Sequence, residues 1–231
     1  PASVTEITSS MFSDCTSLES VTAEGAITKV GNSAFSECSA LTSVTGLESV
    51  TSIGQYAFYQ CRNLSGSMDL SQVTEVGAYA FNECFNLSGT LDLTNLTSVE
   101  TYAFAYYGYN AGGVDELILG SGLESIYSCA FCFTTIKNDV ALPEGLEELG
   151  NGAFYYAQLG SGKLSLPDSV ASLGGWAFQG SNIGELYIGS GLDSIPYDAF
   201  DGCPLTKVTI NASSDDIDVP DGTFPEGAEV E

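Results

Sequence analysis

The chain has 231 residues, of which 44% are hydrophobic and 15% are charged, a composition typical of a folded globular protein. Its 30 Asp and Glu residues outnumber its 5 Lys and Arg residues and give a formal net charge of −25. A surface this acidic repels nucleic-acid phosphates and anionic membranes, so we expect no nucleic-acid partner and no direct membrane insertion. No stretch approaches the roughly 18–20 uninterrupted apolar residues of a membrane span.

The N-terminal residues 1–12 are predicted to form a degenerate first repeat that covers the exposed end of a repeat array. The chain begins at Pro1 without a methionine and shows no signal peptide. We therefore expect a piece of a longer protein, with any export signal and anchor lost from this sequence.

An internal repeat then dominates the chain. The dipeptide Ala-Phe recurs eight times after a degenerate copy at Met11-Phe12, and successive phenylalanines are 23, 23, 23, 23, 27, 23, 24 and 22 residues apart. We predict a single domain, 1–231, of about nine tandem repeats of roughly 23 residues. The phenylalanines of the Ala-Phe pairs are Phe35, Phe58, Phe81, Phe104, Phe131, Phe154, Phe178 and Phe200.

Each repeat is predicted to contain a short helical turn followed by a short strand. In Ile53–Cys61, the Ala, Phe and Cys at positions −1, 0 and +3 relative to Phe share one inward face of such a turn. An alternating run follows, whose first and third side chains are buried in a strand that Gly or Pro ends in several copies. Stacked repeats then form a parallel sheet with about 4.8 Å between strands. The predicted strands are Met68–Leu70, Leu91–Leu93, Leu117–Leu119, Val140–Leu142, Leu164–Leu166, Leu186–Ile188 and Val208–Ile210.

The C-terminal residues 211–231 are predicted to form an acidic cap or the start of a linker, and Phe224 stands at the position of one more degenerate copy. Four aspartates in this segment could ligate calcium, but they lack the spacing and the glycine of an EF-hand loop. A solvated acidic tail is the favoured interpretation. The four are Asp215, Asp216, Asp218 and Asp221.

The segment Ile53-Gly-Gln-Tyr-Ala-Phe-Tyr-Gln-Cys-Arg-Asn-Leu64 resembles the leucine-rich repeats of the BspA type, found chiefly in bacterial surface proteins. Leu164–Val170 is similar to the strand and proline turn of that repeat, and the resemblance covers about residues 10–212. It implies an α/β repeat solenoid, a right-handed leucine-rich-repeat superhelix with a parallel sheet of short strands on one face and helical turns on the other. It also implies a secreted or surface location, roles in adhesion, and no catalytic residues. The 27-residue fifth copy and the loss of Cys in copies five to eight depart from the pattern.

The residue inventory argues against catalysis. The chain has no histidine, which removes Ser-His-Asp and Cys-His arrangements and most zinc sites, and it has no phosphate-binding loop. Paired carboxylates remain available, but the repeat places most of them on turns. We expect neither an enzyme nor a bound cofactor or metal.

The cysteines are predicted to form a ladder of small buried thiols rather than disulfides. Cys38, Cys61 and Cys84 occupy one repeat position with Cys15, so their side chains run parallel instead of converging. Cys129-Ala-Phe-Cys132 has the spacing of a redox motif, and both a redox role and a local disulfide stay open for it.

Aromatic residues recur two positions before or after the column phenylalanine, outside the inward-facing set. We predict that they form a contiguous aromatic stripe on the convex, helical side. Three interpretations remain open: a stiffening ladder, a partner or oligomer interface, and a glycan contact. The stripe comprises Tyr56, Tyr79, Tyr102, Tyr106, Phe133, Tyr156 and Trp176, with Tyr155 nearby and Tyr107 and Tyr109 added by the long copy.

The concave sheet offers a rival site, because repeat proteins often bind ligands on this side. Its outward column is predicted to include Asp69, Asp92, Ile118 and Tyr187 among small polar residues. We therefore expect a non-enzymatic extracellular binding or adhesion module for a protein or glycan on a host or cell surface, with self-association also open. The alternative is a passive spacer or stalk within a larger surface protein.

Overall fold

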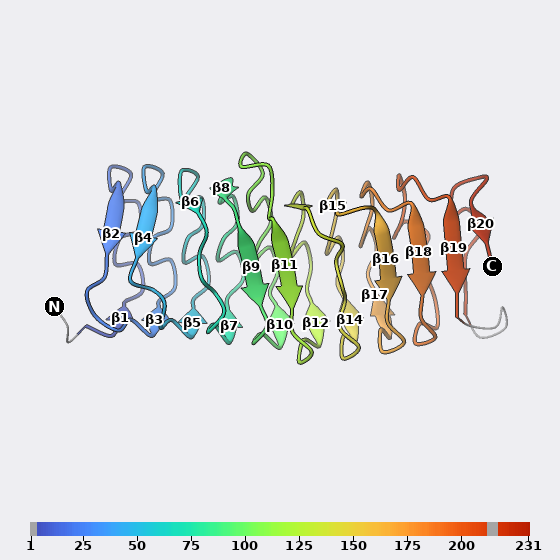
Figure 1. The fold of residues 1–231 in the computed structure, drawn as a ribbon, viewed down its shortest axis with the longest axis horizontal. Coiled ribbons are helices and arrows are strands. Elements are labelled where there is room, and N and C mark those ends of the chain that lie inside the picture. The colour runs from blue at the N-terminus through green and yellow to red at the C-terminus, as the bar shows by residue number, and fades with distance from the viewer. Residues whose placement is uncertain (1–3, 212–216) are drawn as a thin grey trace.

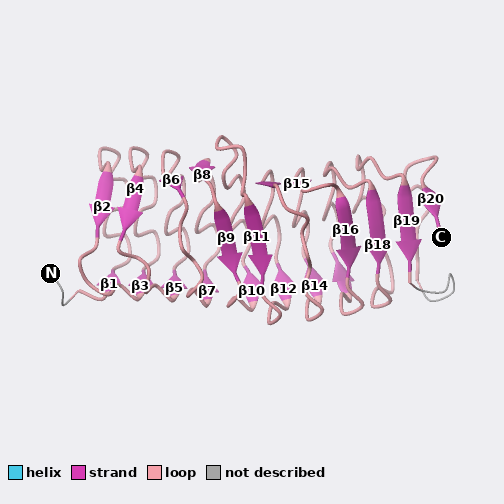
Figure 2. Cartoon of the chain, viewed as in Figure 1, coloured by secondary structure: helices cyan, strands magenta, loops and turns pink. Residues whose placement is uncertain are grey.

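A computed structural model describes residues 4–211 and 217–231 of the chain. The chain winds into a solenoid whose coils follow one another along a single axis, with the two termini at opposite ends (Figure 1). Strands and turns make up all of its described regular structure, and none of these residues is helical (Figure 2). Residues 4–211 and 217–231 accordingly contain no helix able to cross a bilayer.

The longest strands lie on one side of the solenoid, called here the sheet face. They pair in parallel with the next coil, so that Ser20 lies opposite Ser43 and Leu186 opposite Val208. Their alternating burial follows the predicted pattern, since Leu164 and Leu166 of β16 are buried while Ser165 is exposed. These strands are β2 (Ser20–Thr22), β4 (Ser43–Thr45), β9 (Thr90–Leu93), β11 (Glu116–Leu119), β16 (Lys163–Leu166), β18 (Glu185–Ile188) and β19 (Lys207–Ile210).

Two further rows of two-residue strands complete the coils. One row forms two parallel four-stranded sheets. Each of its strands ends at a buried aliphatic residue, which is the residue five positions before the column Phe. The other row forms two pairs on the opposite edge of the coils. The first row is β1 (Glu6–Ile7), β3 (Lys29–Val30), β5 (Ser52–Ile53), β7 (Glu75–Val76), β10 (Ser98–Val99), β12 (Ser125–Ile126), β14 (Glu148–Leu149) and β17 (Ser172–Leu173). The second is β6 (Ser65–Gly66), β8 (Asn86–Leu87), β13 (Thr135–Ile136) and β15 (Gln158–Leu159).

Two of the predicted strands do not form. Residues 68–70 and 140–142 lie in coils but not in strands, so the sheet face is interrupted twice. In the second case the Asn138 side chain provides a physical reason, because its amide accepts from Leu117 N at 2.9 Å and donates to Leu117 O at 3.2 Å. A side chain thereby occupies backbone groups that a strand at 140–142 would otherwise pair.

The predicted helical turns are wrong. Within 54–61, alternate N–H groups turn toward different partners: Tyr59 N–H donates to Tyr56 O in its own coil at 3.2 Å, while Phe58 N–H donates to Ala80 O in the next coil at 2.8 Å. A helix would direct all of these groups along its own axis. The segment is instead a chain of tight turns cross-linked to the neighbouring coil, and the side it forms is called here the turn face.

This alternation requires left-handed backbone at two positions in each coil. Within residues 4–211 and 217–231, all fourteen non-glycine residues with positive φ stand two residues before or after the column phenylalanine, such as Tyr56 (φ 57°) and Gln60 (φ 56°). Positive φ at the third residue of a hydrogen-bonded turn is typical of type II turns and costs a bulky residue about 1–2 kcal/mol. These two positions, the −2 and +2 columns, therefore have a backbone fixed by the fold and a side chain that points outward.

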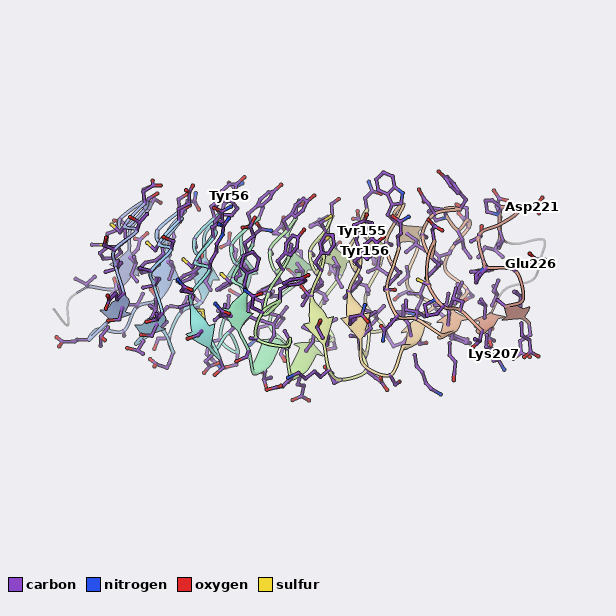
Figure 3. The ribbon with its side chains drawn as sticks, turned by 90° about the horizontal axis from the view of Figure 1, so that it is seen from above. Tyr56, Tyr155, Tyr156, Lys207, Asp221 and Glu226 are labelled. Carbon is purple, nitrogen blue, oxygen red and sulfur yellow. The ribbon has the colours of Figure 1, made fainter. Side chains whose placement is uncertain are left out.

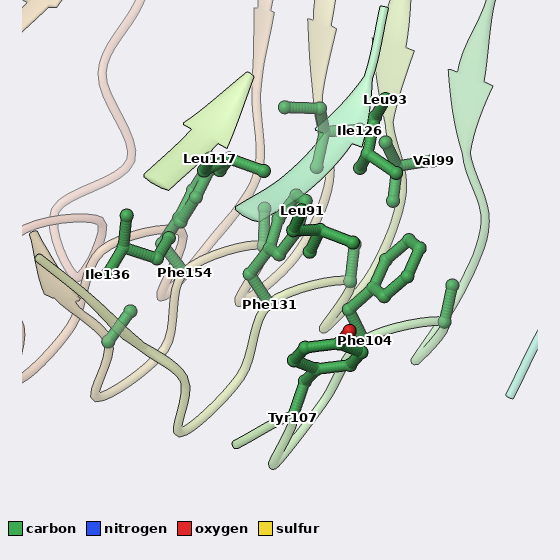
Figure 4. Close-up of a cluster of buried hydrophobic side chains, with 14 of the residues drawn as sticks. Leu91, Leu93, Val99, Phe104, Tyr107, Leu117, Ile126, Phe131, Ile136 and Phe154 are labelled. Atoms are coloured by element: carbon green, nitrogen blue, oxygen red, sulfur yellow. The ribbon is translucent and has the colours of Figure 1, made fainter. Parts of the chain in front are cut away.

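The core is a continuous stack of phenylalanines. Phe35, Phe58 and Phe81 are fully buried, with ring centroids 5.1 and 5.2 Å apart, and the stack continues through every later coil. Figure 4 shows the part of this core around Phe104 and Phe131. Each coil alone would expose its ring, so the array is stable only because neighbouring coils cover it.

The C-terminal end continues this packing. Phe224 lies 6.2 Å from Phe200 in a tilted arrangement, and β20 (Glu229–Val230) pairs with β19. Of the four aspartates considered for calcium, Asp218 and Asp221 are exposed, and Asp215 and Asp216 lie outside the described residues.

Candidate functional site

The −2 and +2 columns bring most of the predicted aromatic residues together as two ladders on the turn face. The first ladder is Tyr56, Tyr79 and Tyr102, with centroids 4.9 Å apart at each step. The second is Tyr106, Phe133 and Tyr156, with steps of 4.6 and 5.7 Å. Within each ladder, ring planes lie 7–13° apart, so the rings cover one another's faces.

Exposure along the turn face is graded rather than uniform. Tyr109, Tyr156 and Trp176 are exposed, at 58%, 49% and 52%, whereas the other ladder rings and Tyr155 are half-buried by stacking. Figure 3 shows Tyr56, Tyr155 and Tyr156 along the same edge of the solenoid, with Lys207 on the opposite edge. The stripe thus presents the edges of its stacked rings to solvent, together with the few rings that are largely exposed.

The prediction that Tyr107 belongs to the outward aromatic stripe is wrong. Its side chain is 1% exposed and lies in the core against Phe104 and Phe81, at centroid distances of 5.7 and 6.1 Å (Figure 4). The reason is its position three residues after Phe, the inward column that holds Cys61 and Cys84 in earlier coils. Its hydroxyl has no hydrogen-bond partner among the described residues, and burial raises the pKa of this phenol well above 10.

Sequence reasoning missed Phe85. This ring lies 6.2 Å from Tyr106 and 6.4 Å from Tyr109, and the Arg62 guanidinium lies 5.9 Å above it. It lies in the coil before the long fifth copy and meets Tyr106, the first ring of the second ladder, edge-on. Its position, four residues after Phe, is polar in the preceding coils, so a bulky apolar residue there was the available signal. The most exposed tyrosine, Tyr197 at 68%, was also missed.

The cysteine column forms the predicted ladder of buried thiols except at Cys15, which lies in the first coil with no preceding coil to cover it and is exposed. Cys38, Cys61 and Cys84 are buried and free, and each thiol donates to the carbonyl of the phenylalanine 26 residues earlier, at 2.9, 3.0 and 3.2 Å. Burial raises the pKa of Cys38 to about 11 and that of Cys61 further, which keeps these groups protonated. Their role is to satisfy buried carbonyls.

Cys129 and Cys132 differ from this column. Both are free thiols, with Cys132 buried and Cys129 half-buried on the turn face. Hydrogen bonding with the Cys132 and Tyr102 side chains lowers the pKa of Cys129 to about 6 despite its partial desolvation. The same hydrogen bond and burial raise the pKa of Cys132. Of the two thiols, Cys129 is therefore the more acidic and the more accessible.

The rival sheet face carries the predicted outward residues but little apolar surface. Asp92 lies opposite Ile118 in register, and both are half-buried. Asp69 is exposed, and hydrogen bonds from Ser71 lower the pKa of its carboxyl. Tyr187 is 38% exposed beside a shallow hollow of about 390 Å³ that Lys163 and Lys207 also line.

Every Lys and Arg in the chain is paired with a carboxylate on an adjacent coil. Arg62 lies 2.7 Å from Glu83, Lys163 lies 2.8 Å from Glu185, and Lys207 pairs with Glu231. Lys29 and Lys137 pair similarly with Glu6 and Asp115. The cations thus lie between acidic coils, and the remaining carboxylates leave the surface strongly negative. No cluster of three or more His, Cys, Asp or Glu suited to a metal occurs within the described ranges.

Parallel coils, stacked column residues and rows of short parallel strands define a parallel-stranded solenoid of the leucine-rich-repeat class. The model of the BspA type leucine rich repeat region, present in six copies, matches residues 1–110 and 105–224. The chain therefore belongs to the BspA-type leucine-rich-repeat family.

Solved structures share the fold at low sequence identity. A leucine rich cell surface protein from Faecalibacterium prausnitzii is 22% identical with a TM-score of 0.58, covering 99% of this chain and 76% of that one. A leucine-rich repeat protein from Bacteroides ovatus is 18% identical with a TM-score of 0.64, covering 98% and 69%. The pneumococcal vaccine antigen PcpA is 23% identical with a TM-score of 0.65, covering 92% and 62%. No curated protein matches the chain.

Proposed function

We propose that the chain is a non-enzymatic module that recognises a protein partner at the cell surface through the aromatic ladders of its turn face. The observation that carries this proposal is the choice of residue in the left-handed columns. The −2 column holds Ser10 and Ser33 and the +2 column holds Asp14 and Glu37 in the first coils, with the same backbone. The fold therefore does not require rings there, and bulky residues bear an unfavourable φ of about 1–2 kcal/mol each.

Rings kept at strained, outward positions favour a binding role. Tyr and Trp are enriched at the centres of protein interfaces, where one edge is apolar and the other carries a hydrogen-bonding group. The similar F. prausnitzii protein is a cell surface protein, which supports an extracellular location for this chain as well. The acidic surface, whose cations are all paired, favours a partner with basic groups around the contact.

The test compares binding and stability in the same variants. Extracellular proteins arrayed on a chip are probed with the wild-type chain, the double variant Tyr106→Ala/Tyr156→Ala and the control Tyr187→Ala from the sheet face. Recognition predicts a bound protein whose affinity falls at least about tenfold in the double variant and not in the control. A passive spacer predicts no specific partner, together with a clear loss of stability in the double variant as stacking is removed.

A further inference from the structure

The first ladder is interrupted on the turn face. Its −2 column runs through Tyr102 and then Cys129, Gly152 and Trp176 in the next three coils, as the backbone hydrogen bonds Tyr102 N to Ser128 O and Cys129 N to Asn151 O show. Three coil steps of about 4.8 Å separate Tyr102 from Trp176 by roughly 14 Å. Two ring layers are therefore missing between two aromatic walls, and we call this gap the slot.

The slot is a formed cavity and not only a gap in the pattern. Its volume is about 560 Å³, with Tyr102, Tyr155 and Trp176 as aromatic walls and Cys129 and Gly152 beneath them. One face of the Tyr102 ring is already covered by Tyr79, 4.9 Å away, so its other face is the one available toward the slot. A Cβ on Gly152 would lie 3.3 Å from the Cys129 sulfur, so any larger residue there would project into this space.

The remaining lining is polar and carries no formal charge. Ser128, Asn151 and Gln179 contribute a hydroxyl and two amides, and none of the eight lining residues is Lys, Arg, Asp or Glu. Gln179 donates to Asp201 at 2.7 Å, whereas the side chains of Ser128 and Asn151 have no hydrogen-bond partner within residues 4–211 and 217–231. Donors and acceptors thus stand free beside flat apolar ring faces.

This combination selects among ligand chemistries. A phenyl side chain of a protein partner would fill the slot but would form no hydrogen bond with the Asn151 amide or the Ser128 hydroxyl. An anionic ligand is opposed by the surrounding charge of −25. A neutral sugar ring satisfies both requirements, because its C–H face packs on an aromatic ring while its hydroxyls bond the amide and hydroxyl groups.

We propose that the slot between Tyr102 and Trp176 binds a neutral carbohydrate, with one or two pyranose rings in place of the two missing aromatic layers. Tyr102 and Trp176 would stack on the sugar faces, and Asn151 with Ser128 would bond its hydroxyls. The slot shares Tyr102 with the first ladder, but sugar binding here does not depend on the proposed protein contact.

The experiment begins with a glycan array carrying neutral and acidic members, probed with the whole chain. Trp176 is the sole tryptophan, so its emission reports directly on the slot when the bound neutral glycans are titrated in solution. Calorimetry then compares Cys129→Tyr, which extends the first ladder into the slot, and Trp176→Ala, which removes a wall, with two controls. Cys129→Ser keeps the slot open without the thiol, and Tyr187→Ala removes an aromatic ring from the sheet face.

The proposal expects saturable binding of a neutral glycan with a change in Trp176 emission. Affinity should fall at least about tenfold in Cys129→Tyr and in Trp176→Ala and persist in both controls. Three results would overturn it: no neutral glycan bound, binding undiminished in Cys129→Tyr, or tighter binding of acidic glycans or of N-acetyltryptophanamide. Tyr106→Ala/Tyr156→Ala should leave glycan binding intact, so failure here is distinguishable from failure of the protein-recognition proposal.

Discussion

Replacing Tyr107 by Phe should stabilise the protein, although it removes a polar group from a native side chain. The Tyr107 hydroxyl is buried with no partner in the described part of the chain, whereas in the unfolded chain it bonds water. An unsatisfied buried hydroxyl costs about 1–3 kcal/mol, and Phe keeps the ring contacts with Phe81 and Phe104. For a chain of this size, each kcal/mol corresponds to a rise in Tm of about 2–4 °C.

The assay is thermal and urea unfolding of Tyr107→Phe, with Tyr156→Phe as the matched control. Tyr156 is 49% exposed, so loss of its hydroxyl should change stability by less than about 0.5 kcal/mol. The pKa of Tyr107 is raised in the folded state, so folded Tyr107 keeps its proton at a pH where the unfolded phenol loses it. Wild-type stability should therefore fall above the ordinary value of 10.0, and the advantage of Phe should widen there. An unchanged or lower unfolding midpoint in Tyr107→Phe would refute the reasoning by showing that the hydroxyl is satisfied.

Three other predictions concern the turn face, the thiols and the charge. Glycine usually destabilises a folded chain relative to alanine, but at Tyr79 (φ 59°) the Gly variant should be about 1 kcal/mol more stable than the Ala variant in urea unfolding. A more stable Tyr79→Ala would contradict the left-handed backbone at this position. Ellman's reagent at pH 7 should modify Cys15 and Cys129 rapidly and the other five thiols only on unfolding, because burial protects those five; rapid reaction of Cys61 or Cys84 would argue against the buried ladder. Raising NaCl from about 10 mM to about 1 M, which shortens the Debye length from about 30 to about 3 Å, should raise Tm by screening the charge of −25, and a fall would mean that the five inter-coil ion pairs outweigh this repulsion.

The repeat phase made most of the fold predictable. From Phe35 onward, spacings of about 23 residues located the buried Phe, Ala and Cys columns correctly, because each column must face a common core once coils stack. In the first coil Phe12 is half-buried and Cys15 is exposed. The helical turns could not be excluded in this way. Inward positions −1, 0 and +3 fit both a helix and a series of tight turns, and the sequence does not show that Phe58 N–H bonds Ala80 in another coil.

The candidate site was predictable only in part. Tyr56 and Tyr156 lie outward as expected, since their columns alternate with the inward set. The prediction for Tyr107 was wrong because this residue stands three positions after Phe104, in the inward column that contains Cys84 in the preceding coil. The slot could not be predicted from the sequence, because it forms where Cys129 and Gly152 replace aromatic residues in the −2 column. Its walls also depend on how the Tyr155 and Trp176 side chains lie in the folded structure.

The direction of the hydrogen bonds has a mechanical consequence. Strands and turns alike run across the long axis, while their inter-coil bonds run along it and join each coil only to its neighbours. Tension applied at the two ends therefore loads successive interfaces in series, and coils should detach one at a time. Each detached coil of 23 residues, the register offset between Glu6 and Lys29, releases about 70 Å of chain beyond its folded rise of about 4.8 Å. Under load, such an array would lengthen stepwise as an extensible tether and hold its remaining coils intact.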